Sequence, residues 1–230
     1  MSTTARNLPL HDASAEQAPL RFVTAASLFD GHDAAINIMR RLIQAQGAEV
    51  VHLGHNRSVE DVVRAALQED ADAIALSSYQ GGHVEYFKYM VDMLKERGAS
   101  HIRVFGGGGG TITPEEIREL QAYGVERIYH PNDGMHMGLV AMIEDVIKRT
   151  REAQAARIAA EGSDAVPPAQ VSIDDEIAVG HALTAIEEGR HDELVLDRLR
   201  KEWQLAGSRT PVIGITGTGG AGKSSVVDEL

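Results

Sequence analysis

Short apolar runs alternate with amphipathic segments along the chain from Arg21 onward. Runs of a few apolar residues predict buried strands, whereas apolar residues spaced three and four positions apart predict helices. The predicted strands cover residues 21–28, 48–53, 73–76, 102–105 and 127–129, and the predicted helices cover residues 33–46, 59–69, 83–97, a segment that begins at Thr113-Pro114, and a long segment from Met135 onward. Alternation of this kind predicts a parallel sheet with helices on both faces.

Residues with strong local preferences support the ends of these elements. Ser58 and Thr113 precede predicted helices, where a hydroxyl can accept a hydrogen bond from the free N–H groups of the first turn. Pro114 follows Thr113, and proline is favoured at the first helical position. Gly47 and Gly98 follow predicted helices, and glycine commonly ends a helix.

The order of the strands decides where a ligand would bind. Right-handed crossovers and five alternating units favour the flavodoxin-like strand order 2-1-3-4-5. Ligands of such sheets bind beyond the carboxyl ends of the strands, near the reversal of order between strands 1 and 3. His32 follows the first predicted strand, Ser77 follows the third, and the glycine run 106–110 follows the fourth. We therefore expect these residues at one edge of the sheet.

The remaining sequence predicts a linker and the beginning of a second domain. Pro167-Pro168 is typical of a linker, residues 172–203 predict two helices broken near Gly189, and residues 211–215 predict a new strand. The expected organisation is an N-terminal arm at residues 1–20, a first domain at 21–155, a helical linker leading into the second domain at 156–210, and a truncated second domain at 211–230.

The composition argues against several classes of function. The chain has 22 basic and 34 acidic residues, so a broad nucleic-acid surface is not expected. It has no cysteine, which excludes disulfides, thiolate metal sites and cysteine nucleophiles. Residues 1–20 lack the apolar core of a signal peptide, and no segment approaches the ~20 apolar residues of a membrane helix. We expect a cytoplasmic protein without nucleic-acid or membrane partners.

His32 is the strongest candidate for metal chemistry. Imidazole can ligate a transition metal through one ring nitrogen while a carboxylate orients the other, and Asp30 lies two positions before it. A metal held by protein alone needs three or four ligands, and no cluster of such ligands accompanies His32. A metal here would arrive with equatorial ligands of its own, in a macrocycle. The alternative is a loop histidine that caps the next helix, a role for which Asp33 is better suited.

Three short motifs resemble the cobalamin-binding signature of the methylmalonyl-CoA mutase family, Asp-x-His-x-x-Gly, Ser-x-Leu and Gly-Gly. The corresponding motifs here are Asp30-x-His32-x-x-Ala35, Ser77-x-Tyr79 and Gly109-Gly110. Residues 36–76 separate the first two motifs, which matches the spacing in the family. Ala35 and Tyr79 depart from the signature, and both are similar to the isobutyryl-CoA mutase branch of the family.

The resemblance implies adenosylcobalamin as the cofactor. His32 would be the lower axial cobalt ligand, Asp30 its hydrogen-bond partner, and the displaced nucleotide tail would enter a cleft at the other motif positions. The residues implied to bind the cofactor are Asp30, Gly31, His32, Ser77, Tyr79, Gly109 and Gly110. The five-glycine run could form a simple turn, but its large ordering cost favours close approach of a ligand to the backbone.

A second motif, residues 217–224, fits the P-loop pattern Gly-x4-Gly-Lys-Ser between a predicted strand and a predicted helix. Backbone N–H groups of such a loop bind phosphates, Lys223 would reach the β and γ oxygens, and Ser224 would bind Mg²⁺. The predicted nucleotide-binding residues are Gly217, Gly219, Gly220, Ala221, Gly222, Lys223, Ser224 and Ser225. The later parts of a P-loop NTPase do not follow, so we expect a longer parent polypeptide. GTP rather than ATP is implied by the resemblance alone.

Together the two motifs resemble mutases of this family that carry a fused G-protein chaperone. The resemblance implies a parent enzyme that interconverts isobutyryl-CoA and n-butyryl-CoA by radical rearrangement, with GTP hydrolysis assisting cofactor loading. The acyl-CoA would bind to further C-terminal domains, the parent would be a homodimer, and this fragment alone would be inactive. The alternatives are another acyl-CoA mutase, such as methylmalonyl-CoA mutase, and a corrinoid-carrier or cobalamin-sensing module fused to an NTPase. A flavin or phospho-acceptor domain is weakly supported.

Overall fold

The computed structural model describes residues 18–32, 34–161, 172, 175–208, 211 and 213–229. Contacts divide the chain into two units, Met1–Arg190 and His191–Leu230. The predicted cap Asp33, the linker prolines Pro167-Pro168 and residues 1–17 of the predicted arm lie outside the described residues.

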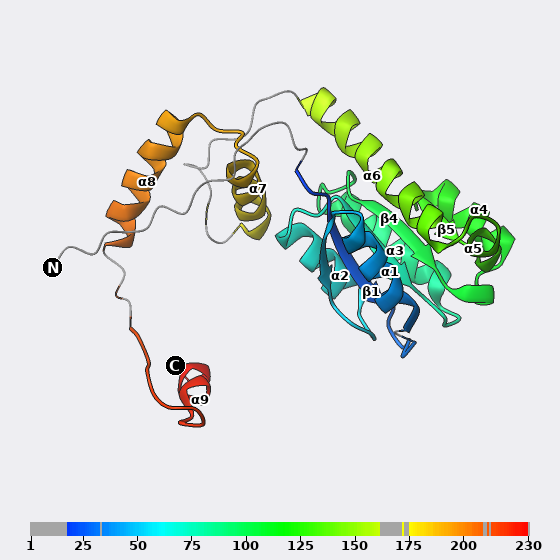
Figure 1. The fold of residues 1–230 in the computed structure, drawn as a ribbon, viewed down its shortest axis with the longest axis horizontal. Helices are drawn as coiled ribbons and strands as arrows, with labels where there is room; N and C mark the ends of the chain where they lie inside the picture. The colour runs from blue at the N-terminus through cyan, green and yellow to red at the C-terminus, as the bar shows by residue number, and fades with distance from the viewer. Residues whose placement is uncertain are drawn as a thin grey trace. The chain divides into compact units, whose positions relative to one another are not determined.

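Five parallel strands form the sheet of the larger unit (Figure 1). They are β1 (Arg21–Ala26), β2 (Glu49–His52), β3 (Ala73–Ser77), β4 (Arg103–Gly107) and β5 (Arg127–Tyr129). Their order is β2-β1-β3-β4-β5, which confirms the predicted flavodoxin-like topology. Ser77 pairs with Ala26 of β1 on one side and with Gly107 of β4 on the other. The carboxyl ends of β1, β3 and β4 therefore meet at one edge.

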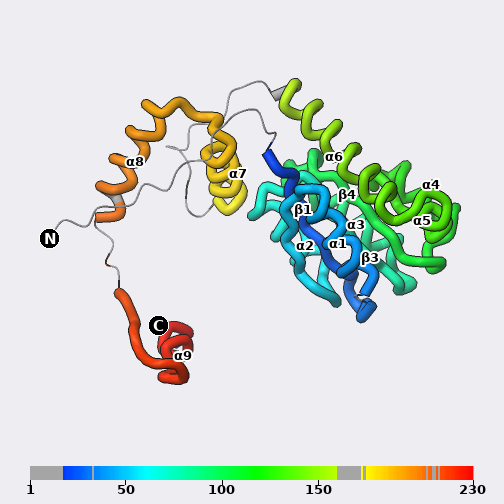
Figure 2. The backbone as a smooth tube through the Cα atoms, in the orientation of Figure 1, coloured from blue at the N-terminus to red at the C-terminus, as the bar shows by residue number. Residues whose placement is uncertain are grey.

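Helices follow each strand, and the path of the backbone through them can be traced in Figure 2. They are α1 (Ala34–Ala45), α2 (Val59–Gln68), α3 (His83–Glu96), α4 (Pro114–Tyr123), α5 (Pro131–Met137) and α6 (Leu139–Glu161), with a short 3₁₀ turn, η1 (Gly109–Thr111), after β4.

The helices bury apolar side chains against both faces of the sheet. On one face Val62 of α2, Phe87 of α3 and Leu120 of α4 form a single cluster with the strands. On the other face Ile43 of α1 and Ile143 of α6 pack in a second cluster. Each fully buried side chain of this size contributes about 1.5–3 kcal/mol of hydrophobic stabilisation. Side chains of both layers therefore hold the strand edge in place.

The predicted helix caps are confirmed. Ser58 Oγ accepts a hydrogen bond from the Asp61 N–H at 3.1 Å, and Thr113 Oγ1 accepts one from the Glu116 N–H at 3.3 Å. In both helices the acidic side chain accepts in return from the N–H of the capping residue. Each pair satisfies two N–H groups that the first turn would otherwise leave free.

The long helix expected from Met135 is confirmed as α6, but its predicted start is wrong, because α5 occupies the segment up to Met137 and α6 begins only at Leu139. His130 caps α5, Pro131 begins it, and Gly138, with φ of 81°, separates it from α6. Glycine adopts this left-handed conformation at little cost, whereas a helix cannot continue through it. Because α5 ends only two positions before α6 begins, their apolar residues together have the spacing of a single helix.

The segment after Pro167-Pro168 contributes a helix to the larger unit. Helix α7 (Glu176–Glu187) packs against α2, and a Cβ atom on Gly180 would lie 2.8 Å from the Gln68 carbonyl oxygen. Arg21 joins the two elements, because its Nη1 donates to the Glu69 carbonyl at 2.8 Å and to Thr184 Oγ1 at 3.1 Å. Part of the predicted linker thus packs on the first domain, while the domain boundaries themselves stay predictions.

The smaller unit contains α8 (Glu193–Gly207) and α9 (Lys223–Asp228). The two helices predicted on either side of Gly189 are confirmed as α7 and α8, and Gly189 has φ of 65°. The expected strand at residues 211–215 is absent from its described positions, 211 and 213–215. A strand exists through hydrogen bonds to a neighbouring strand, and the described part of this unit provides no such neighbour.

No helix among the described residues has both the length and the apolar content to cross a membrane.

The cap of α4 provides a test of the fold. We expect Thr113→Ala to lower the free energy of unfolding by about 1 kcal/mol, because the Glu116 N–H loses its acceptor. Thr113→Ser retains the hydroxyl and should unfold at nearly the same urea concentration as the unchanged protein. Equal midpoints for the Ala and Ser variants would show that the cap contributes nothing.

Candidate cofactor-binding site

A buried carboxylate organises the loop that follows β1. The Asp30 side chain has no exposed surface, and its Oδ1 accepts hydrogen bonds from the His32 backbone N–H and lies 2.8 Å from His32 Nδ1. Its Oδ2 accepts a third hydrogen bond from the Tyr79 N–H at 2.6 Å. Asp30 therefore joins the loop after β1 to the loop after β3.

The pairing with Asp30 determines which nitrogen of His32 is available. A carboxylate oxygen can only accept, so Nδ1 donates the hydrogen, and in the neutral ring Nε2 retains its lone pair. The His32 side chain is 75% exposed, and its ring lies 5.4 Å from the Tyr79 ring, centroid to centroid. The loop thus presents an oriented, accessible imidazole nitrogen, which is the arrangement that metal-ligating histidines require.

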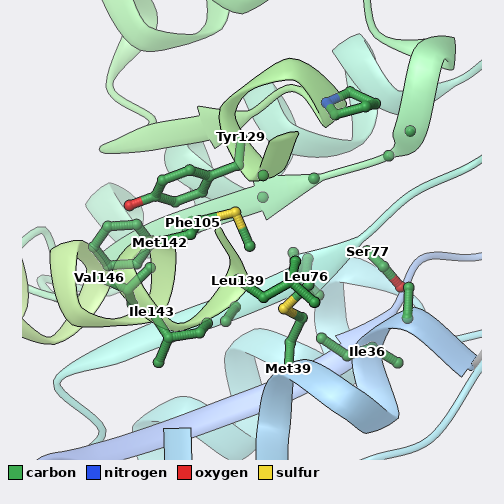
Figure 3. A pocket seen from close by; sticks show the side chains of 18 of the residues that line it. Ile36, Met39, Leu76, Ser77, Phe105, Tyr129, Leu139, Met142, Ile143 and Val146 are labelled. Carbon is green, nitrogen blue, oxygen red and sulfur yellow. The ribbon is translucent and has the colours of Figure 1, made fainter. Parts of the chain in front are cut away.

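An apolar cavity lies beside this loop at the same edge of the sheet, between α1, α6 and the strands (Figure 3). We call it the α1–α6 cavity. Its volume is about 210 Å³, larger than the ~150 Å³ engineered cavity that accepts benzene. The labelled residues that line it are Ile36, Met39, Leu76, Ser77, Phe105, Tyr129, Leu139, Met142, Ile143 and Val146. The cavity is therefore large enough for a ring-sized apolar group.

One polar atom in the cavity wall has no protein partner. Ser77 Oγ is buried and makes no hydrogen bond within the described residues, whereas the neighbouring Ser78 Oγ accepts from Ser27 Oγ at 2.8 Å. A buried hydroxyl without a partner costs about 1–3 kcal/mol. A ligand with a hydrogen-bonding atom at this position would recover that energy.

Tyr129 lines the cavity with its ring rather than with its hydroxyl. The hydroxyl donates to Asp145 Oδ2 at 2.8 Å. Burial, together with this hydrogen bond and the nearby negative charge of Asp145, raises the pKa of Tyr129 far above its ordinary value. The phenol remains neutral, and the cavity gains an aromatic wall without a charge.

The glycine run allows close approach at particular positions. A Cβ atom on Gly108 would lie 1.8 Å from the Ser78 carbonyl oxygen, and one on Gly106 would lie 2.4 Å from the Phe87 ring. Gly109 has φ of 58°, and a Cβ atom there would meet the Tyr79 ring at 2.7 Å. Around Gly110 there is open space, which leaves room beside the backbone. The glycine run is therefore a turn, and it is also the place where the loop after β4 crosses the loop after β3 in close contact.

The structure brings most of the predicted cofactor residues to one place. Ser77, Tyr79 and Gly109 line the α1–α6 cavity, and Asp30 and His32 are joined to Tyr79 at its edge. Gly31 lies exposed in the His32 loop, and Gly110 follows the cavity lining in η1.

Sequence reasoning missed the helical walls of the cavity. Met39 of α1 and Leu139, Met142 and Ile143 of α6 supply much of its apolar lining. In sequence these residues have the spacing of ordinary core residues. The one feature that could have indicated their role is that their helices flank the sheet edge where the ligand was expected. His130 also lines the cavity, and its Nδ1 accepts from the Asn132 N–H at 3.2 Å.

The predicted P-loop forms a turn that leads into a helix. Lys223 begins α9, and its Nζ donates to the carbonyl oxygens of Gly217 at 2.9 Å and Thr218 at 2.8 Å. Gly220 and Gly222 have φ of 76° and 75°. The turn comprises Gly217, Gly219, Gly220, Ala221 and Gly222, and Ser224 and Ser225 lie in the first turn of α9. The lysine side chain therefore spans the glycine-rich turn.

The fold and this edge define a cofactor-binding domain of the flavodoxin-like type. The family model described as "B12 binding domain" matches residues 20–140, and the chain belongs to this family.

Curated relatives extend the similarity beyond the family domain. The chain is 59% identical over 211 residues to a fused isobutyryl-CoA mutase of Cupriavidus metallidurans and 52% identical over 216 residues to one of Geobacillus kaustophilus. Each alignment covers 92% of this chain and 19% of the relative, so the chain spans about a fifth of their length. It is also 31% identical over 113 residues to the 2-hydroxyisobutanoyl-CoA mutase small subunit of Aquincola tertiaricarbonis, covering 49% of this chain and 82% of the relative.

The glycine run provides a test of the site. We expect Gly108→Ala to lower the free energy of unfolding by about 1–3 kcal/mol, because its Cβ must displace the Ser78 carbonyl. Gly110→Ala, with open space around it, should lie within about 0.5 kcal/mol of the unchanged protein in the same urea titration. Equal losses of unfolding free energy in the two variants would show that the backbone at Gly108 does not pass so close to the Ser78 carbonyl.

Proposed function

We propose that this chain binds cobalamin with His32 as the axial ligand of cobalt and with the cofactor's nucleotide tail in the α1–α6 cavity. The observation that carries the proposal is the Asp30–His32 pair, which holds an accessible Nε2 at the edge of an apolar cavity. The family match and the mutase relatives support it.

The residues at the site fit such a cofactor. Asp30 keeps the hydrogen on Nδ1 and orients the exposed ring of His32, which leaves the lone pair on Nε2 available to a metal. The apolar walls accept an aromatic base, and Ser77 Oγ, which has no partner among the described residues, supplies a polar contact. The open space beside Gly31 and Gly110 allows a bulky group to approach the backbone. When bound, adenosylcobalamin supplies a carbon radical by homolysis of its cobalt–carbon bond, and the protein supplies binding and orientation.

For the whole protein we propose an acyl-CoA mutase that interconverts isobutyryl-CoA and n-butyryl-CoA. The names and identities of the fused relatives support this choice over a corrinoid carrier or a cobalamin sensor. The P-loop supports a fused nucleotide domain that binds GTP with Mg²⁺ at Ser224 and assists cofactor loading. We expect the whole enzyme to be a cytoplasmic homodimer, with acyl-CoA bound by other domains.

Electron paramagnetic resonance of bound cob(II)alamin tests His32 directly. In uniformly ¹⁵N-labelled protein the cobalt signal should show coupling to a protein nitrogen, and His32→Ala should remove that coupling and weaken binding tenfold or more, roughly the lower limit for losing a partner in a metal site. His136→Ala, at an exposed histidine of α5, is the matched control and should leave the coupling intact. Coupling only to the cofactor's own unlabelled base in the unchanged protein would refute the proposal.

The nucleotide site is tested in the whole protein. We expect Lys223→Ala to weaken GTP binding about 10- to 100-fold, because a charge-assisted hydrogen bond to phosphate is worth about 1.5–3 kcal/mol. Lys201→Ala, at an exposed lysine of α8, should leave the GTP dissociation constant unchanged in the same calorimetric titration. A Lys223→Ala protein that binds GTP with unchanged affinity would argue against a P-loop.

A further inference from the structure

The turn that delivers Asp30 to its buried position has an unfavourable residue at its centre. The Asp30 N–H donates to the Ser27 carbonyl at 3.0 Å, which closes a four-residue turn directly after β1. Phe29 is the third residue of this turn and has φ of 64°. Turns with a positive φ at this position favour glycine or asparagine, and a bulky side chain there is strained.

A residue on the neighbouring loop holds this turn from outside. Asn56 Oδ1 accepts a hydrogen bond from the Phe29 N–H at 2.8 Å, and the Asn56 N–H donates to the Asp30 carbonyl at 3.2 Å. Asn56 itself has φ of 56°, a conformation that asparagine tolerates better than most residues. Its two hydrogen bonds bracket the peptide between Phe29 and Asp30.

The loop that carries Asn56 is itself anchored to the sheet and to α3. The Arg57 N–H donates to the Ala26 carbonyl at 3.1 Å, which extends the pairing of β1 with β2 beyond the strands. The Tyr86 hydroxyl donates to the Arg57 carbonyl at 2.8 Å from the first turns of α3. The backbone beside Asn56 is therefore held in place when Asn56 binds the Phe29 turn.

We infer that Asn56 is a positioning residue for the cobalt ligand, acting through the Phe29 turn and Asp30 on His32. This inference rests on the function proposed above. The chain of contacts runs from Asn56 to the Phe29–Asp30 peptide, and from the Asp30 carboxylate to His32 Nδ1 and the Tyr79 N–H. Without the Asn56 side chain the strained turn can relax, and the carboxylate that orients the imidazole moves with it.

Two substitutions separate the side-chain bond from the backbone conformation of Asn56. Asn56→Asp retains an Oδ1 acceptor and tolerates the left-handed conformation, whereas Asn56→Gly retains the conformation and the backbone N–H but loses the side-chain acceptor. We expect the Gly variant of the 230-residue chain to bind cob(II)alamin roughly tenfold more weakly, as loss of one hydrogen bond allows. At saturating cofactor it should show a reduced fraction with protein-nitrogen coupling, and the Asp variant should restore that fraction.

Thermal unfolding of the cofactor-free variants, measured alongside, detects a purely structural loss. A Gly variant with full nitrogen coupling and unchanged affinity would overturn the inference, and so would an Asp variant as impaired as the Gly variant. If the unchanged protein shows no protein-nitrogen coupling, the proposed function itself fails, which is a different outcome from either of these.

The Phe29→Gly substitution keeps the inference testable if Asn56→Gly alone does not fold. Glycine at position 29 removes the strain that Asn56 offsets, so Phe29→Gly should restore folding and nitrogen coupling to the double variant. A double variant that remains unfolded, or that folds without recovering the coupling, would overturn the role assigned to Asn56.

Discussion

The carboxylate of Asp30 is the group on which the rest of the site depends. A fully buried carboxylate is stable only where donors surround it, and here three donors from two loops do so. The same three bonds fix the tautomer of His32 and the position of the Tyr79 backbone. A carboxylate can serve both purposes because its two oxygens accept in different directions. The His32 imidazole and Tyr79, which lines the cavity, are therefore both held by a single side chain.

The second constraint is the crossing of the loops after β3 and β4. Strands β3 and β4 are neighbours, so the loops that leave their carboxyl ends must pass close together. Gly108 permits this because any side chain there would occupy the position of the Ser78 carbonyl oxygen. Ser78 is bonded to Ser27 on the far side, which ties the crossing to β1. Three consecutive strands in the sheet thus share one connected set of loops at their ends.

The fold could be predicted from the sequence because its signals are local. Strand and helix periodicity, and caps such as Ser58 and Thr113, depend on residues a few positions apart, and the strand order follows from the handedness of the crossovers. The break at Gly138 was missed because apolar residues continue through it with helical spacing. Its signals, Pro131 at the start of α5 and Gly138 after the end of α5, are weaker than that periodicity.

The site was predicted less completely, since its chemistry depends on contacts between distant residues. Asp30 and His32 are two positions apart, so their pairing could be anticipated. The bond from Asp30 to the Tyr79 N–H spans 49 positions, and no pattern in either segment indicates it. Met39 and Ile143 face the cavity from helices whose residues resemble ordinary core positions. Only the packing of α1 beside α6 distinguishes them.

The α1–α6 cavity also has a thermodynamic consequence for the protein without its cofactor. Its walls include Met39 of α1 and Met142 of α6, which are 103 positions apart in the chain, so it forms only when distant parts of the fold have come together. Apolar surface left unfilled forgoes packing contacts, and this loss belongs entirely to the folded state. A ligand that fills the cavity binds the folded chain and not the unfolded one, and it raises stability with the logarithm of its free concentration. A cofactor that fills the cavity as proposed would therefore make the resistance of this domain to unfolding rise with cofactor supply.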